Sequence, residues 1–143
     1  MKTILALTAL LSLGLTGPVL AQAQGGPVAD TPILAGATLA SDCGNLHDLA
    51  GKAFCVSAPL GSVGALADAY VAHFEERGWL PASGENNRLV MVRRREAGGC
   101  DGIQMIAFYD TTRPTVPESI AYLGFATIPG NVCTAPDAGA PAQ

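Results

Sequence analysis

The feature that most constrains the fold is an amphipathic stretch near the middle of the chain, residues 61–79. Ser62 is the expected N-cap, its hydroxyl accepting a backbone N–H, and Gly78 is the expected left-handed residue after the helix end. Trp79 should then pack back on Phe74. Apolar side chains recur every three or four residues and so share one stripe of a helix: Val63, Leu66, Ala67, Tyr70, Val71 and Phe74.

Three segments after this helix have the composition of strands, because they are rich in β-branched and aromatic residues. They span residues 88–95, 102–110 and 119–128, and residues 52–57 form a weaker fourth candidate. The intervening stretch 81–87, PASGENN, has the composition of a loop. Since short connections favour antiparallel neighbours, we predict an α+β fold. One amphipathic helix packs on a three- to four-stranded antiparallel sheet, in the order (β)-α-β-β-β.

Both alternating sets of side chains in these strands are apolar. Leu89 and Met91, for example, alternate with Val90 and Val92, whereas a sheet with one wet face should alternate apolar and polar residues. One helix can cover only one face. We therefore expect the second face to be covered by residues 33–57, by a second copy of the chain in a self-dimer, or by an envelope protein or a small ligand.

Four cysteines predict two disulfides, because the count is even and the chain carries an export signal. If residues 101–110 and 119–129 form a hairpin, Cys100 lies near Cys133, which leaves Cys43 to pair with Cys55. A zinc site or a redox centre would require closer Cys or Cys/His spacing, such as C-x-x-C, which this sequence lacks.

The two ends of the chain differ in composition from its middle. Residues 1–23 combine Lys2, an apolar run and the small-residue pattern LAQA, which predicts a cleaved secretory signal peptide rather than a membrane helix. We expect residues 24–40 to form a flexible leader, 41–133 the disulfide-stapled domain, and 134–143 a disordered tail of Ala, Pro and Gly. The mature chain should be exported, to the periplasm or beyond, without a stable membrane anchor.

The net charge argues against one class of partner. The formal charge is −4, and removing residues 1–23 with Lys2 makes it more negative. Nonspecific binding to nucleic acids requires a basic surface. No nucleic-acid partner is therefore expected.

The histidines and acidic residues form no obvious catalytic set. His47 precedes Asp48, and His73 lies three residues before Glu76, a spacing that an ordinary helix surface explains. A small hydrolase would have to assemble its site from these scattered residues and Asp101. No metal-, nucleotide- or cofactor-binding motif is present, so we expect neither a metal nor a cofactor.

One pair of cationic residues is a candidate ligand site. Arg93 and Arg95 share a face of the first predicted strand and could clamp a carboxylate or phosphate. A solvated strand end that blunts edge pairing explains the same residues. On balance the sequence favours a small exported binding module of the cell envelope over an enzyme. The alternatives are a small periplasmic hydrolase and an inhibitor or immunity-type protein that blocks a site on another protein.

Overall fold

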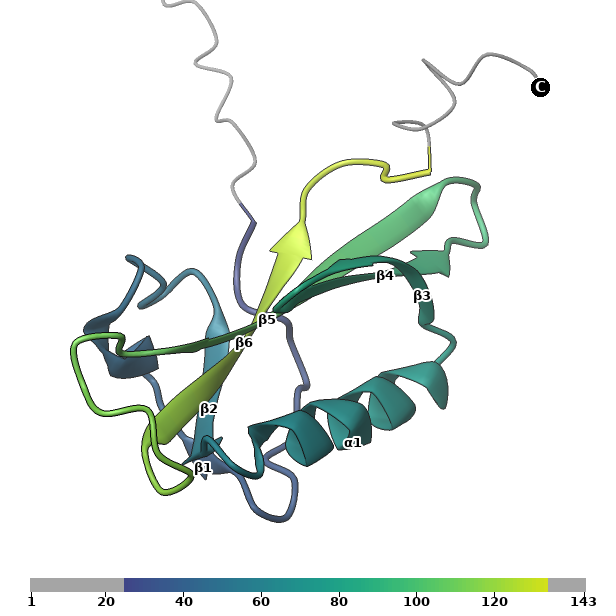
Figure 1. Ribbon diagram of the computed structural model, residues 1–143. Coiled ribbons are helices and arrows are strands. Elements are labelled where there is room, and N and C mark those ends of the chain that lie inside the picture. The colour runs from purple at the N-terminus through teal and green to yellow at the C-terminus, as the bar shows by residue number, and fades with distance from the viewer. Residues whose placement is uncertain (1–24, 134–143) are drawn as a thin grey trace, which may run out of the picture.

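One helix, α1 (Val63–Glu75), lies against one face of a six-stranded antiparallel sheet (Figure 1). The computed structural model describes residues 25–133, so the predicted signal peptide and tail lie outside the described residues. The strand order across the sheet is β1-β2-β6-β5-β4-β3, and a short 3-10 turn, η1 (Cys43–Asn45), precedes β2. The strands are β1 (Thr38–Leu39), β2 (Phe54–Pro59), β3 (Leu80–Glu85), β4 (Arg88–Arg94), β5 (Cys100–Tyr109) and β6 (Ile120–Ile128).

The α+β prediction is confirmed, but the prediction of three to four strands is wrong. The largest difference is β3, which occupies most of the stretch predicted as a loop. It lies at the edge of the sheet next to β4, and all six of its residues are exposed. Pro81 is tolerated there because an edge strand does not need every backbone N–H, and the register shifts between Pro81 and Ser83. An exposed edge strand needs no alternating apolar pattern, so residues 80–85 carry no strand signal in their sequence.

The C-terminal end of α1 agrees with the prediction. Gly78 has φ +82°, the Trp79 N–H donates to the Phe74 carbonyl at 3.1 Å, and the Gly78 N–H donates to the Glu75 carbonyl at 3.0 Å. These two bonds form a Schellman cap, and the Trp79 and Phe74 rings meet edge to face. The N-terminal cap differs from the prediction, because the Ser62 hydroxyl donates to the Pro59 carbonyl and makes no cap hydrogen bond.

Replacing Gly78 with alanine should destabilise the domain by about 1 kcal/mol, because an L-residue with positive φ is strained. A Cβ there would meet nothing closer than the Arg93 Cδ at 3.9 Å, so the cost comes from the backbone. Gly64→Ala is the matched control. Gly64 lies inside α1, where an added methyl group would meet no atom within 4 Å, and its replacement should stabilise the domain by up to about 1 kcal/mol. Urea denaturation measures both, and effects of the same sign would contradict this account.

The main core lies between α1 and the sheet, and it also holds part of the predicted leader. The Tyr70 hydroxyl, on α1, donates to the Pro32 carbonyl at 2.8 Å and accepts from the Leu34 N–H at 3.3 Å. Burial raises the pKa of Tyr70. Val28 is buried in the same core, and Pro27 forms a bridge with Ala126 of β6. The packed region therefore begins well before residue 41.

The opposite face of the sheet is covered in part by the segment that precedes β2. Cys43, Ala53 and Phe108 are buried there, and partly buried apolar residues pack against them: Ala40, Leu46, Leu49, Ile106, Tyr122 and Ala126. Val90 and Val92 of β4 alternate with the core residue Met91, and both are partly exposed. The chain thus covers the β2–β6 side of this face itself, and a partner for the β4 side remains a prediction.

Both predicted disulfides are present. Cys43 pairs with Cys55 and Cys100 pairs with Cys133, with Cα–Cα distances of 5.3 Å in each case. The first joins the covering segment to β2, and the second joins the start of β5 to the chain that follows β6. The β5–β6 hairpin brings Cys100 close to Cys133, and the predicted pairing is confirmed.

Candidate functional site

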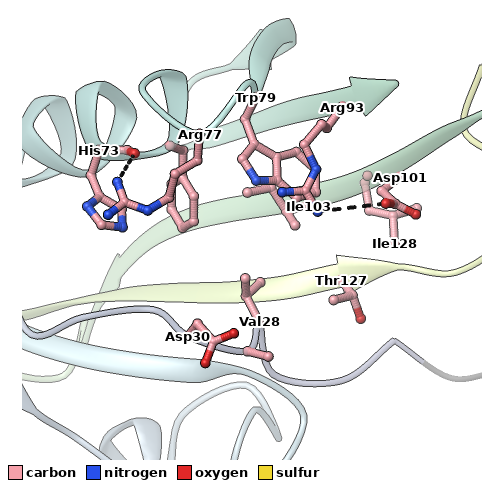
Figure 2. A pocket seen from close by; sticks show the side chains of 13 residues that line it. Val28, Asp30, His73, Arg77, Trp79, Arg93, Asp101, Ile103, Thr127 and Ile128 are labelled. Atoms are coloured by element: carbon pink, nitrogen blue, oxygen red, sulfur yellow. Dashed lines mark hydrogen bonds and ion pairs between the residues drawn. The ribbon is translucent and has the colours of Figure 1, made fainter. Parts of the chain in front are cut away.

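A pocket of about 470 Å³ lies beside the C-terminal end of α1 (Figure 2). Because β4, β5 and β6 are antiparallel, the end of β4, the start of β5 and the end of β6 meet at this end of the sheet. Residues 28–30 form the remaining wall. Its volume is in the range of small-molecule sites. The lining residues are Val28, Ala29, Asp30, His73, Phe74, Arg77, Trp79, Arg93, Asp101, Gly102, Ile103, Thr127 and Ile128.

One wall of the pocket consists of buried apolar side chains. Trp79 is fixed by the Schellman cap and is 7% exposed, and Phe74 beside it is also buried. Ile103 of β5 and Val28 are buried as well, and they come from segments far apart in the sequence. Since these side chains pack against the main core, the pocket wall is preformed.

Arg93 is the cationic group held most directly by this wall. Its guanidinium carbon lies 4.5 Å from the centroid of the Trp79 ring, a cation–π arrangement. The pairing of Leu80 with Val92 places Trp79 and Arg93 next to each other across the β3–β4 hairpin. Asp101, the cross-strand partner of Arg93 on β5, lies 3.9 Å from the Arg93 guanidinium.

Arg95, the second arginine of the predicted clamp, has different contacts. Its Nε donates to the Asp101 carboxylate at 2.6 Å, and its Nη2 donates to the Gly130 carbonyl at 2.8 Å. It does not line the pocket. Asp101 thus lies between the two arginines, and Arg93 is the member that faces the pocket. Anion binding by this pair remains a prediction.

His73, in the last turn of α1, and Arg77, in the turn that follows the helix, complete the same side of the pocket. The Arg77 Nη1 donates to the His73 carbonyl at 2.8 Å. The His73 Nε2 is buried and has no hydrogen-bond partner among residues 25–133. Burial, and then the nearby Arg77 charge, lower the pKa of His73 below its ordinary value of 6.5, while Glu76 opposes the shift. The imidazole is therefore neutral at neutral pH, with one donor and one acceptor nitrogen.

Asp30 lies on the other side of the pocket. Figure 2 shows its carboxylate on the N-terminal segment, across from Arg77 and Arg93. It is exposed, and its φ of +59° belongs to a turn that follows Val28. The pocket is therefore bipolar: Arg77 and Arg93 lie on one side together with Asp101, and the Asp30 carboxylate lies on the other.

The five residues considered for a hydrolase are not assembled into one site. His73 and Asp101 line this pocket, but the described hydrogen bonds of Asp101 go to Arg95, not to His73. His47 lies on the opposite face of the sheet, where its ring meets Phe108 edge to face at 5.4 Å. Asp48 is next to His47 in the chain and does not line the pocket. The Glu76 carboxylate lies 3.9 Å from the Arg77 guanidinium and is also absent from the lining. Within residues 25–133, no group of three or more His, Cys, Asp or Glu side chains could hold a metal.

Two further hollows of similar size occur in the described part of the chain. One of about 490 Å³ lies beside the loop 110–119, and one of about 420 Å³ lies between α1 and the β3–β4 hairpin. Neither contains a guanidinium fixed on a buried aromatic ring. The pocket beside Trp79 is therefore the better candidate for a site that recognises a ligand.

Comparison with known proteins adds no functional information. The chain matches no protein-family model, and no curated protein or solved structure is significantly similar to it. No helix in the described range 25–133 is both long and apolar enough to cross a membrane.

Proposed function

We propose that the chain is a small exported, non-catalytic binding module of the cell envelope, with the pocket beside Trp79 as its ligand site. The observation that carries this proposal is the stack of Arg93 on the buried Trp79 ring. A cation fixed over an aromatic wall is already ordered before a ligand arrives. Less conformational entropy is then lost on binding, which favours recognition.

The rest of the pocket supports the same function. Arg77 is held by the His73 carbonyl, and Trp79 is held by the helix cap, so the polar groups have defined positions. The composition of residues 1–23 and the two disulfides favour export, because disulfides persist in oxidising compartments. The alternative, a small hydrolase, would use His73 and Asp101. Both line the pocket, but no hydrogen bond joins them among the described residues.

Trp79 is the chain's single tryptophan, so its emission should report directly on the pocket. The proposal predicts that a screen of chemically diverse small molecules, covering cations, anions and neutral compounds, contains at least one that changes this emission saturably. In ¹H–¹⁵N NMR spectra, the same compound should shift the signals of residues 73–79, 93 and 101–103. The compound should be recovered chemically unchanged. Shifts confined to residues 110–122, or conversion of the compound into a product, would contradict the proposal.

Export has its own test. When the full-length chain is expressed in bacteria, the protein recovered from the periplasm should begin at Gln24, because cleavage is expected after Ala23. Mass spectrometry of that material measures the cleavage position. Recovery of the full-length chain from the cytoplasm alone would contradict export, and the ligand screen would then decide the binding function by itself.

A further inference from the structure

The contacts of Asp101 determine which arginine of the pocket keeps an uncompensated positive charge. The 2.6 Å bond from Arg95 to Asp101 is a short, charge-assisted hydrogen bond, whereas Arg93 lies 3.9 Å from the same carboxylate. Asp101 is therefore compensated mainly by Arg95, which lies outside the pocket lining. Arg93 keeps most of its donors available. Its guanidinium carbon lies over the Trp79 ring, which places its N–H donors at the wall of the pocket.

The remaining charges favour an anion over a cation. With Asp101 compensated by Arg95, two guanidinium groups, Arg77 and Arg93, face a single carboxylate, Asp30. The pocket is thus locally positive in a chain whose formal charge is −4. Figure 2 shows both arginines on the same side of the pocket, with the Arg77 guanidinium turned toward His73 and the Arg93 guanidinium beside Trp79. Arg93 is therefore the arginine placed to bind an anionic group.

The apolar part of the pocket restricts the ligand further. Phe74, Trp79, Ile103 and Val28 are all buried, and they form a wall adjoining the arginines. These side chains are 2–8% exposed, so a ligand can contact only their accessible edges. An apolar group attached to the anion would bury that remaining surface, which contributes roughly 25 cal/mol per Å².

On the basis of the proposed function, we infer that the ligand is an amphipathic anion. Arg93 binds a carboxylate or phosphate group, and an alkyl or aromatic group of the same molecule packs against the accessible edges of Trp79 and Phe74. Asp30 then disfavours a second negative charge at the opposite end. A carboxylate and a phosphate monoester present the same chemistry to a guanidinium group, so both belong in the test.

The test uses octanoate, octyl phosphate, octylamine and inorganic phosphate, each titrated against the disulfide-intact chain with Trp79 emission as the readout. We expect octanoate or octyl phosphate to bind saturably, and whichever of the two binds more tightly identifies the head group. Octylamine and inorganic phosphate should bind at least about tenfold more weakly, because octylamine lacks the anionic group and inorganic phosphate lacks the apolar group.

Substitutions of single charged residues test where the anionic group of the ligand binds. Arg93→Gln should weaken binding of the better anion by about tenfold or more, and Arg93→Lys should give an intermediate loss because lysine keeps the charge but not the flat fork. Arg94→Gln is the matched control, since Arg94 alternates with Arg93 on the same strand and is absent from the pocket lining. It should leave the affinity within about twofold. Asp30→Asn should strengthen anion binding severalfold, because it removes the one opposing carboxylate.

The outcomes separate this inference from the proposed function. If octylamine or another cation binds at Trp79 and neither octyl anion does, the inference is overturned and the pocket remains a ligand site. Equal losses for Arg93→Gln and Arg94→Gln would overturn it as well, because they would indicate attraction by general surface charge. If no compound in the diverse screen reaches the pocket, the proposed function fails together with the inference.

Discussion

Phe125→Ala is expected to lower the free energy of unfolding by about 3–5 kcal/mol, the typical cost of deleting a fully buried phenylalanine side chain. Phe125 has no exposed surface and lies where three elements meet. Its ring centroid is 4.6 Å from that of Tyr70 and 5.8 Å from that of Phe74 on α1, and 6.3 Å from that of Phe54 on β2. Alanine would leave a cavity that the helix and the sheet could close only by moving toward each other. Urea denaturation followed by circular dichroism measures the loss.

Two further variants keep this prediction testable if the alanine variant does not fold. Phe125→Leu retains most of the apolar volume and should cost clearly less than the alanine variant. Leu80→Ala is the surface control, because Leu80 is 62% exposed on the edge strand β3, and it should change stability by no more than about 0.5 kcal/mol. Similar losses for Leu80→Ala and Phe125→Ala would show that Phe125 is not central to the core.

Apart from the disulfides, the features that the sequence predicted correctly depend on residues close together in the chain. The apolar stripe of α1 and the Schellman cap at Gly78 are local patterns, and the contact of Trp79 with Phe74 follows from that cap. The disulfide pairing was accessible because one hairpin, β5–β6, carries Cys100 toward Cys133. Strand β3 was missed because its exposed edge position demands no apolar pattern.

The candidate pocket was harder to predict because its residues meet through registers that the sequence does not display. Arg93 was identified as a candidate anion ligand, and Trp79 was identified as part of the helix cap. Their stacking depends on the pairing of Leu80 with Val92, which could not be derived while β3 was predicted as a loop. Asp30 escaped notice because the small, Pro- and Gly-containing composition of its segment predicts a flexible leader. That composition hides Val28, whose burial holds the segment against the core.

Removal of the Cys43–Cys55 disulfide is expected to cost about 3 kcal/mol, and removal of Cys100–Cys133 about 4 kcal/mol, from the lengths of the loops that they close. The sequence separations are 12 and 33 residues. The paired substitutions are Cys43→Ala/Cys55→Ala and Cys100→Ala/Cys133→Ala, because alanine places no hydroxyl at the buried positions of Cys43, Cys55 and Cys100. Urea denaturation under oxidising conditions measures both losses.

The two pairs should differ in a second measurement, because only Cys43–Cys55 anchors the segment that covers the second sheet face. Cys43 and Cys55 are both buried there beside Phe108. Without the link, residues 40–53 should separate from β5 and β6 more often and expose this apolar surface. A dye that fluoresces on apolar surfaces should then bind more strongly to the Cys43→Ala/Cys55→Ala variant than to the other pair, at a temperature where both keep native circular dichroism. Equal dye binding by the two variants would mean that packing alone holds the covering segment, and that the disulfide contributes only to global stability.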